Sequence, residues 1–387
     1  MRTFFRRLFT QESSGIAASA LIISVASLLS RLLGVVRDRL LAGQFGAGIE
    51  LDAYYAAFRV PDLLFNLLIV GALSAGFIPL FSEYLEQRSE KEAWTLAAQI
   101  LTVLTSVIAV VAVFVAIAAP WIVPLFTTGF SAEGIALTVT MTRIMTISPI
   151  LLGISGVMGG ILQAKKQFLA FALAPVFYNI GIIIGITIFA RLWGIVGVAW
   201  GVALGSFFHA CIQTFPAFQL GFRGICRRPR WSDGVRRLLW MMIPRTASLA
   251  VAQINLLIVL ALASSLSLGS VSVFTLATNI QSLPFGLIGI SVAVAAFPAL
   301  SQAANQGAER SFQRLLLQQV AWLWFLLVPV TVLFYLFAPQ LVYVVLGAGK
   351  FDATNIIRTT EILRILVIAL PAQSVVALLV RAYYAKQ

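Results

Sequence analysis

The sequence predicts an all-α polytopic membrane protein. Of its 387 residues, 60% are hydrophobic and only 11% are charged, whereas soluble domains carry about a quarter charged residues. Apolar stretches of about 20 residues recur along the whole chain, and each is long enough to cross ~30 Å of hydrocarbon. These stretches are continuously apolar rather than alternating, which disfavours a β-barrel.

Hydropathy, together with the Gly, Pro and charged residues that separate the apolar runs, predicts ten helices. We expect these helices to form two lobes around a central cationic cavity. A six-helix N-lobe at 1–220 holds helices at 15–42, 53–82, 93–118, 136–162, 169–190 and 194–220. A basic cytoplasmic linker follows at 221–237. An incomplete C-lobe at 238–387 holds helices at 238–265, 271–299, 315–346 and 358–385.

The net charge of +13 is explained better by membrane topology than by nucleic acid, which we do not expect as a partner. One set of loops carries most of the 27 Lys and Arg residues, and the opposite set carries only Arg191, Lys350 and Arg358. Basic loops stay in the cytoplasm, so both termini are predicted there. The basic linker is also suited to bind anionic lipid headgroups. We interpret the first apolar run as a retained membrane span rather than a cleaved signal peptide.

The two predicted lobes share a short repeated pattern. The second helix ends "GALSAGFIPLFSEYL" and the eighth ends "GISVAVAAFPALSQA". Pro79 and Pro298 are separated by the same number of residues as Ser82 and Ser301. Such a parallel repeat is typical of transporters that bind substrate between two halves.

Charged residues within the predicted spans are the strongest functional signal. An arginine at the bilayer centre costs at least ~2.5 kcal/mol, so these side chains either snorkel to an interface or face a hydrated cavity. In the first helix Arg31 and Asp38 share a face, and Arg37 and Arg39 flank it. The basic residues concerned are Arg31, Arg37, Arg39, Arg59, Arg143, Arg245 and Arg364, accompanied by Asp38, Asp52 and Asp62.

A cavity rich in arginine and poor in acid indicates an anionic substrate, because guanidinium binds phosphate in a bidentate manner. Arg59 and Asp62 are spaced to pair on one helix face. For Arg245 an interfacial anchor and a cavity role stay equally open, and Asn279 either faces the interior or bonds a neighbouring helix. The candidate substrate-binding residues are Arg31, Arg37, Asp38, Asp52, Arg59, Arg245 and Asn279.

Nothing in the sequence points to an enzyme. No Ser/His/Asp or Cys/His motif and no phosphate-binding glycine loop is visible. The single histidine, His209, is expected to be a packing residue, and Cys211 and Cys226 indicate neither a disulfide framework nor a metal site. We therefore expect no catalytic residue, no metal and no cofactor.

The opening block "SRLLGVVRDRLLAGQFGAGIELDAYYAAFRVPDLL", followed by "GALSAGFIPLFSEY", closely resembles the start of the MurJ/MviN family. Weaker resemblances continue through "AAPWIVPLFTTGF", "GGILQAKKQF", "APVFYNIG", "LPFGLIGISVAVAAFPALS" and "VLGAGKFD" to "RAYYAKQ". These proteins are lipid II flippases of bacterial inner membranes, within the multidrug/oligosaccharidyl-lipid/polysaccharide exporter superfamily.

The resemblance implies alternating access by two lobes, with a cationic cavity that holds the pyrophosphate of lipid II. It leaves the coupling ion open among Na⁺, H⁺ and Cl⁻, and it implies cell-wall synthesis proteins as partners. By position, Arg31, Arg37 and Asp38 match the family's charges in helix 1. Asp52 matches an aspartate in helix 2, and Arg59 falls where the family has Lys or Arg.

Three departures from the family pattern matter. Phe65 and Asn66 stand where a cavity arginine is usual, and Thr278 and Asn279 stand where Asp-Arg is common. The chain also has about ten helices where relatives have about fourteen, which we interpret as a C-terminal truncation. Two alternatives therefore stay open: another polyprenyl-linked oligosaccharide or drug exporter of the superfamily, and a non-transporting scaffold in cell-wall synthesis.

Overall fold

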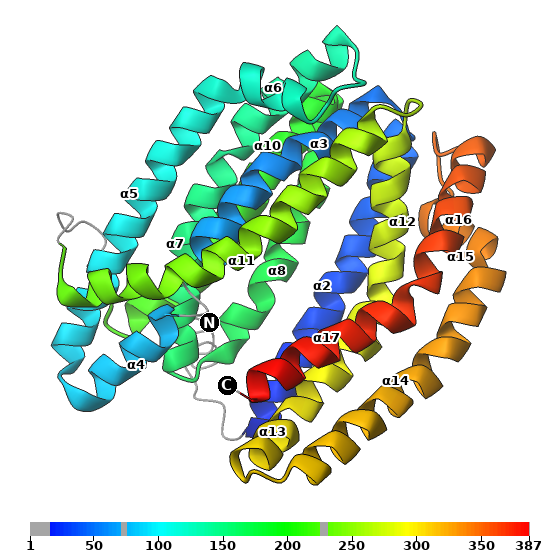
Figure 1. The fold of residues 1–387 in the computed structure, drawn as a ribbon. Coiled ribbons are helices and arrows are strands. Elements are labelled where there is room, and N and C mark those ends of the chain that lie inside the picture. The colour runs from blue at the N-terminus through cyan, green and yellow to red at the C-terminus, as the bar shows by residue number, and fades with distance from the viewer. Residues whose placement is uncertain (1–15, 71–75, 225–230, 387) are drawn as a thin grey trace, which may run out of the picture. The chain divides into compact units, whose positions relative to one another are not determined.

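The computed structural model describes residues 16–70, 76–224 and 231–386, which form helices joined by short turns (Figure 1). Within them, nine helical segments are long and apolar enough to cross a membrane, and the bent pair α16 and α17 makes a tenth. The predicted all-α, multi-pass membrane architecture is therefore confirmed. The basic N-terminal segment, Cys226, the middle of the linker and part of the "GALSAGF" motif lie outside the described residues.

The first compact unit comprises residues up to Leu41 together with Gly48–Val271. Its long helices begin close to the predicted positions. The elements are α2 (Ile16–Phe45, whose last residues belong to the second unit), α3 (Ile49–Leu64), η1 (Phe65–Val70), α4 (Ile78–Gln87), α5 (Glu90–Ile122), η3 (Val123–Leu125), α6 (Ala132–Met145), α7 (Ile147–Ala164), α8 (Phe168–Ile184), η4 (Gly185–Phe189), α9 (Ala190–Trp193), α10 (Ile195–Gln219) and α11 (Asp233–Ser264).

The second unit comprises Ala42–Ala47 and Ser272–Gln387. Its elements are α12 (Ser270–Pro284, which begins in the first unit), η5 (Phe285–Ile290), α13 (Ser291–Asn305), α14 (Glu309–Leu336), α15 (Ala338–Leu346), α16 (Ala353–Ile368) and α17 (Leu370–Ala385). α13, α14 and α17 pack around a core that includes Leu300, Leu323 and Leu378. The end of α2 joins this unit through a hydrogen bond from the Lys350 backbone N–H to the Gly43 carbonyl, 2.7 Å.

Several predicted helices are interrupted in the structure, and local chemistry explains the breaks. The predicted helix at 136–162 divides at Thr146, whose hydroxyl donates to the Arg143 carbonyl at 2.6 Å and so competes with the helical ladder. The predicted helices at 315–346 and 358–385 divide just before Pro339 and Pro371, respectively. A proline lacks the N–H that a helix interior needs, and α16 and α17 consequently meet at 44°.

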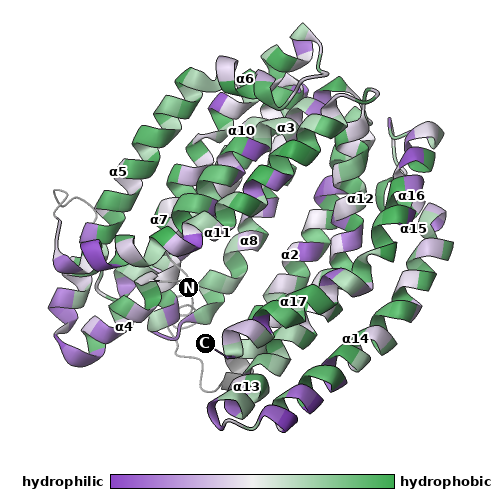
Figure 2. Cartoon of the chain, viewed as in Figure 1, coloured by the Kyte–Doolittle hydropathy of each residue, from purple (hydrophilic) through white to green (hydrophobic). Residues whose placement is uncertain are grey.

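Hydropathy follows the helices in the way that a membrane protein requires. Apolar residues cover most of the length of α5, α11 and α14, whereas hydrophilic residues gather around α4 and at the turn between α13 and α14 (Figure 2). Large apolar side chains such as Trp121, Phe114 and Phe325 are exposed. Hydrocarbon chains, rather than water, suit such a surface.

Glycines allow α8 and η4 to lie in close contact with α10. A Cβ added at Gly201 would lie 2.5 Å from the Cα of Gly185, and one added at Gly181 would overlap the backbone of Gly205. Membrane helices commonly use such small residues because close backbone approach maximises van der Waals contact. This close packing holds α8 against α10. α8 carries one of the polar residues described below.

We predict that Gly201→Ala lowers the free energy of unfolding by about 1–3 kcal/mol, because its methyl group has no room against Gly185. Thermal unfolding of the purified chain in detergent measures the effect. The matched control is Gly34→Ala, since no heavy atom lies within 4 Å of a Cβ at that position. A melting temperature for Gly201→Ala equal to that of Gly34→Ala would contradict this account of the packing.

Candidate functional site

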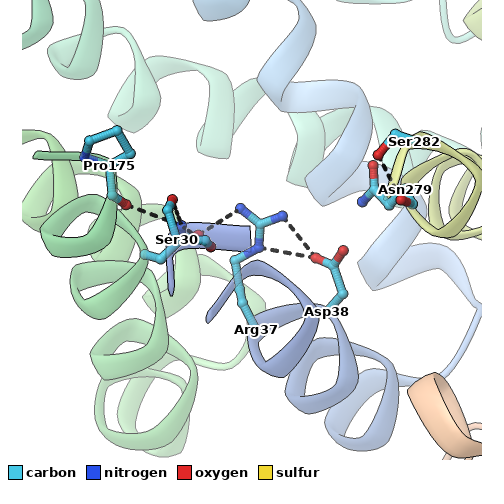
Figure 3. A network of polar contacts seen from close by, with 7 residues as sticks. Ser30, Arg37, Asp38, Pro175, Asn279 and Ser282 are labelled. Carbon is cyan, nitrogen blue, oxygen red and sulfur yellow. Dashed lines mark hydrogen bonds and ion pairs between the residues drawn. The ribbon is translucent and has the colours of Figure 1, made fainter. Parts of the chain in front are cut away.

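The Arg37 guanidinium makes three hydrogen bonds to described side chains of the first unit. Its Nε and Nη2 donate to Asp38 Oδ1 at 3.0 and 2.9 Å. Figure 3 shows the two side chains, both from α2, directed toward one another. The Asp38 side chain is only 8% exposed and that of Arg37 23%. Since neither charge is well hydrated, each one depends on the other.

A residue from another helix completes the coordination of Arg37. Arg37 Nη1 donates to Asn179 Oδ1 on α8 at 3.2 Å. Asn179 Nδ2 in turn donates to the carbonyl and the hydroxyl of Ser30 on α2, each at 3.2 Å, and to the Pro175 carbonyl at 3.1 Å (Figure 3). Together these bonds join α2 to α8 beside the predicted anion-binding arginine.

Aromatic side chains of α3 surround the same charges. Tyr54 and Tyr55 are buried, and their rings meet edge to face with centroids 5.4 Å apart. Both side chains interact electrostatically with Arg37 and Asp38. The Tyr55 hydroxyl is buried and has no hydrogen-bond partner among the described residues. An unpartnered buried hydroxyl is costly in a protein interior, so this group keeps an unused donor and acceptor.

Arg59 and Asp62 extend the cluster along α3. Asp62 interacts electrostatically with Arg59 and with Arg37, and Tyr178 of α8 interacts with Asp62 and Arg37. Arg59 and Asp62 do not form a direct ion pair, although their spacing allows one, and the buried Arg59 Nε has no hydrogen-bond partner within the described ranges. The site therefore contains a second guanidinium with unused donors.

Asp52 lies at the opposite end of α3 from Asp62, and its role differs from that of the arginine cluster. The carboxylate is 3% exposed, and its Oδ2 accepts a hydrogen bond of 2.7 Å from the Gly269 backbone N–H. Gly269 has a φ of +85°, a conformation suited to glycine. Asp52 thus anchors the turn between α11 and α12 to α3.

Three further predicted site residues, Arg31, Arg245 and Asn279, lie on α2, α11 and α12, respectively. Arg31 is half-buried on α2, and Arg245 is exposed on α11; neither forms a hydrogen bond or ion pair with another residue that the structure describes. Asn279 lies on α12 in the second unit, where its carbonyl accepts from the Ser282 hydroxyl at 2.7 Å (Figure 3). In the first unit, therefore, Arg37 pairs directly with Asp38, and Asp62 interacts electrostatically with both Arg37 and Arg59.

His209 lies in a polar cluster between α7 and α10. Its Nδ1 lies 2.8 Å from the Ser155 hydroxyl, and Gln213 Nε2 donates to the same hydroxyl at 2.9 Å. No carboxylate of the described chain hydrogen-bonds to the imidazole. A Ser–His pair used in nucleophilic catalysis has a third group that orients the histidine, so these contacts fit helix packing.

Sequence reasoning did not identify Asn179, Tyr54, Tyr55 and Tyr178 as site residues. For Asn179 a signal exists, because a lone amide in an otherwise apolar membrane helix must find a polar partner. The partner itself is not visible in the sequence, since Arg37 precedes Asn179 by 142 positions.

Comparison with known proteins places this arrangement in a family. Residues 41–387 match the family described as lipid II flippase MurJ. The lipid II flippase MurJ of Burkholderia cenocepacia is 31% identical over 379 residues, covering 95% of this chain and 73% of the relative. The chain belongs to the MurJ family. The resemblance inferred from the opening block is thereby confirmed.

Solved structures agree with the assignment to the MurJ family. Lipid II flippase MurJ in an inward closed conformation superposes with a TM-score of 0.80 at 25% identity, covering 95% of this chain and 76% of that chain. An inward-facing multidrug resistance MATE transporter of the MOP superfamily gives a TM-score of 0.72 at 17% identity, covering 95% and 87%. The second likeness shows only that the fold is shared with that superfamily.

We predict that Asp52→Ala speeds hydrogen exchange of the backbone amides around Gly269. Removing the carboxylate leaves the buried Gly269 N–H without its acceptor, which costs about 1–3 kcal/mol. Exchange monitored by mass spectrometry over residues 264–270 measures the change. Asp52→Asn, which keeps an acceptor oxygen, and Glu50→Ala, in the same helical turn, serve as controls; equal exchange in all three variants would contradict the anchor.

Proposed function

We propose that this chain translocates lipid II from the cytoplasmic to the outer leaflet of a bacterial inner membrane by alternating access. One observation carries the proposal: the half-buried Arg37 guanidinium shares an electrostatic partner, Asp62, with a second arginine, Arg59, whose Nε has no hydrogen-bond partner in the described chain. Such a pair suits a pyrophosphate, which presents several negatively charged oxygens to planar N–H donors. Family membership supplies the substrate, lipid II.

In this proposal Asp38 competes with the substrate for the N–H donors of Arg37. The carboxylate occupies the Nε and Nη2 donors of Arg37 when no anion is present, and an arriving phosphate exchanges with it or binds beside it. Because the pair is poorly hydrated, an isolated charge is costly there, so the phosphate must contact Arg37 as the Asp38 carboxylate leaves. Release of the phosphate then restores the ion pair.

The remaining candidate residues have assigned roles in the same cycle. Arg31 and Arg245 meet the headgroup as further cations, Asn279 contributes a polar contact from the C-lobe, and Asp52 holds the α11–α12 turn. The linker 221–237 separates the N-lobe at 1–220 from the partial C-lobe at 238–387. Transport involves no bond chemistry and no cofactor; Na⁺, H⁺ or Cl⁻ couples it, and cell-wall synthesis proteins are partners.

The function is tested by adding lipid II of fixed composition to vesicles that hold the purified chain and by following its appearance in the other leaflet. In parallel, the chain is expressed in a bacterium depleted of its own lipid II flippase. Translocation together with restored growth supports the proposal. Movement of another polyprenyl-linked saccharide but not of lipid II, or no movement at all, would contradict it.

We predict that Arg37→Ala lowers lipid II translocation at least tenfold, since one charge-assisted contact to phosphate is worth about 1.5–3 kcal/mol. Arg37→Lys keeps the charge but loses the planar fork, so an intermediate rate is expected. Initial rates in vesicles measure both variants. The control is Arg88→Ala, which removes an exposed arginine paired with Glu92 at 3.4 Å; equal rates for the two alanine variants would refute the role of Arg37.

We predict a cytoplasmic N-terminus, with the turn at Arg88 inside and the turn at Arg191 outside. The check uses single cysteines, Arg88→Cys and Arg191→Cys, in a chain whose Cys211 and Cys226 are replaced by serine. A membrane-impermeant maleimide added to intact cells is expected to label the cysteine at position 191 and to label that at 88 only after lysis. The reverse pattern would invert the proposed topology.

A further inference from the structure

Asn179 is a polar residue whose contacts extend in two directions. It lies on α8, one helical turn after Pro175, and is 7% exposed. On one side it contacts Arg37, and on the other it contacts its own helix and Ser30. No other amide in the described part of the chain hydrogen-bonds to the Arg37 guanidinium.

The chemistry of these contacts requires a carboxamide. The Oδ1 atom accepts from Arg37 Nη1, while Nδ2 donates to oxygen atoms of Ser30 and Pro175. Asn offers an acceptor and two N–H donors on one short, planar group. A carboxylate lacks the donors, a hydroxyl reaches only one side, and an apolar side chain offers neither.

The same contacts determine which donors of Arg37 stay unused. A guanidinium carries five N–H groups. Two are directed at Asp38 and one at Asn179, so within the described chain two N–H groups remain for another acceptor. Because the guanidinium is planar and rigid, three bonds from two helices define the direction of the remaining two.

We propose that Asn179 is a positioning residue for Arg37, which presents its two remaining N–H groups to a substrate phosphate in the orientation that Asn179 sets. Asn179 itself does not contact the phosphate. The inference rests on the proposed function, in which Arg37 binds the pyrophosphate, and adds a residue of α8 to that site.

A purely structural role has different consequences. If Asn179 only ties α2 to α8, its removal lowers stability and weakens every ligand, whether or not Arg37 is present. If Asn179 acts through the guanidinium, its removal weakens phosphate binding only while Arg37 is present. A double-mutant cycle measures this difference.

The experiment measures binding of farnesyl pyrophosphate, a short polyprenyl pyrophosphate, to the full chain in detergent by titration calorimetry. The four proteins are the unmodified chain, Asn179→Leu, Arg37→Gln and the double variant. Asn179→Leu is expected to weaken binding about tenfold in the unmodified chain and less than twofold in the Arg37→Gln chain. Gln163→Leu is the matched control, because that amide donates only to Gly159 of its own helix, at 3.3 Å.

A second variant keeps the test sharp if Asn179→Leu folds poorly. Asn179→Asp preserves size and shape but places a carboxylate beside Arg37, which satisfies the guanidinium more strongly and repels an incoming phosphate. Its affinity for farnesyl pyrophosphate is expected to fall below that of Asn179→Leu. Affinity equal to that of the unmodified chain would overturn the positioning role.

The outcomes separate the two proposals. Unchanged binding in Arg37→Gln overturns the role of Arg37 in the proposed function, and with it the inference. Weakened binding in Arg37→Gln, combined with an equal effect of Asn179→Leu in both backgrounds, overturns only the positioning role. A loss confined to the background that keeps Arg37, with normal binding by Gln163→Leu, supports both.

Discussion

The central constraint on this molecule is that charge inside an apolar helical bundle requires fixed partners. Lipid hydrocarbon offers none, and an isolated guanidinium in it is strongly disfavoured. Arg37 meets the constraint with one carboxylate on its own helix and one amide on α8. These bonds, together with the bond from Asn179 to the Ser30 carbonyl, tie α2 to α8. The close packing of α8 on α10 at their glycines in turn holds α8 against the rest of the first unit.

Hydropathy was sufficient to predict the long helices, because the cost of burying polar residues in lipid restricts where a span begins and ends. The predicted helix at 194–220 corresponds to α10 at Ile195–Gln219. The divisions inside other spans were not predicted. The break at Thr146 depends on a side-chain hydrogen bond to the Arg143 carbonyl. Threonine makes such bonds in unbroken helices as well, so its presence in a sequence does not locate a break.

The candidate site could be predicted only in part, because the sequence shows which residues are charged but not which residues they contact. Arg37 and Asp38 stand out as charges in an apolar run. Helical geometry grouped Asp38 with Arg31, whereas in the structure Asp38 pairs with the adjacent Arg37. Long, flexible side chains reach around a helix in ways that Cβ directions alone do not specify. The contact with Asn179 comes from tertiary packing between distant segments, which no local pattern encodes.

The repeated proline pattern gains meaning from the irregular helices that precede it. In the first unit the π-helical segment η1 precedes Pro79 of α4, and in the second unit η5 precedes Pro298 of α13. Each segment has six residues, and the two start at the same distance from their prolines to within one residue. A π-helical turn is rare and weakens a helix locally, and it is found frequently at functional sites. Its occurrence before the repeated proline in both units extends the sequence repeat to the local helix geometry, as expected of a transporter built from two similar halves.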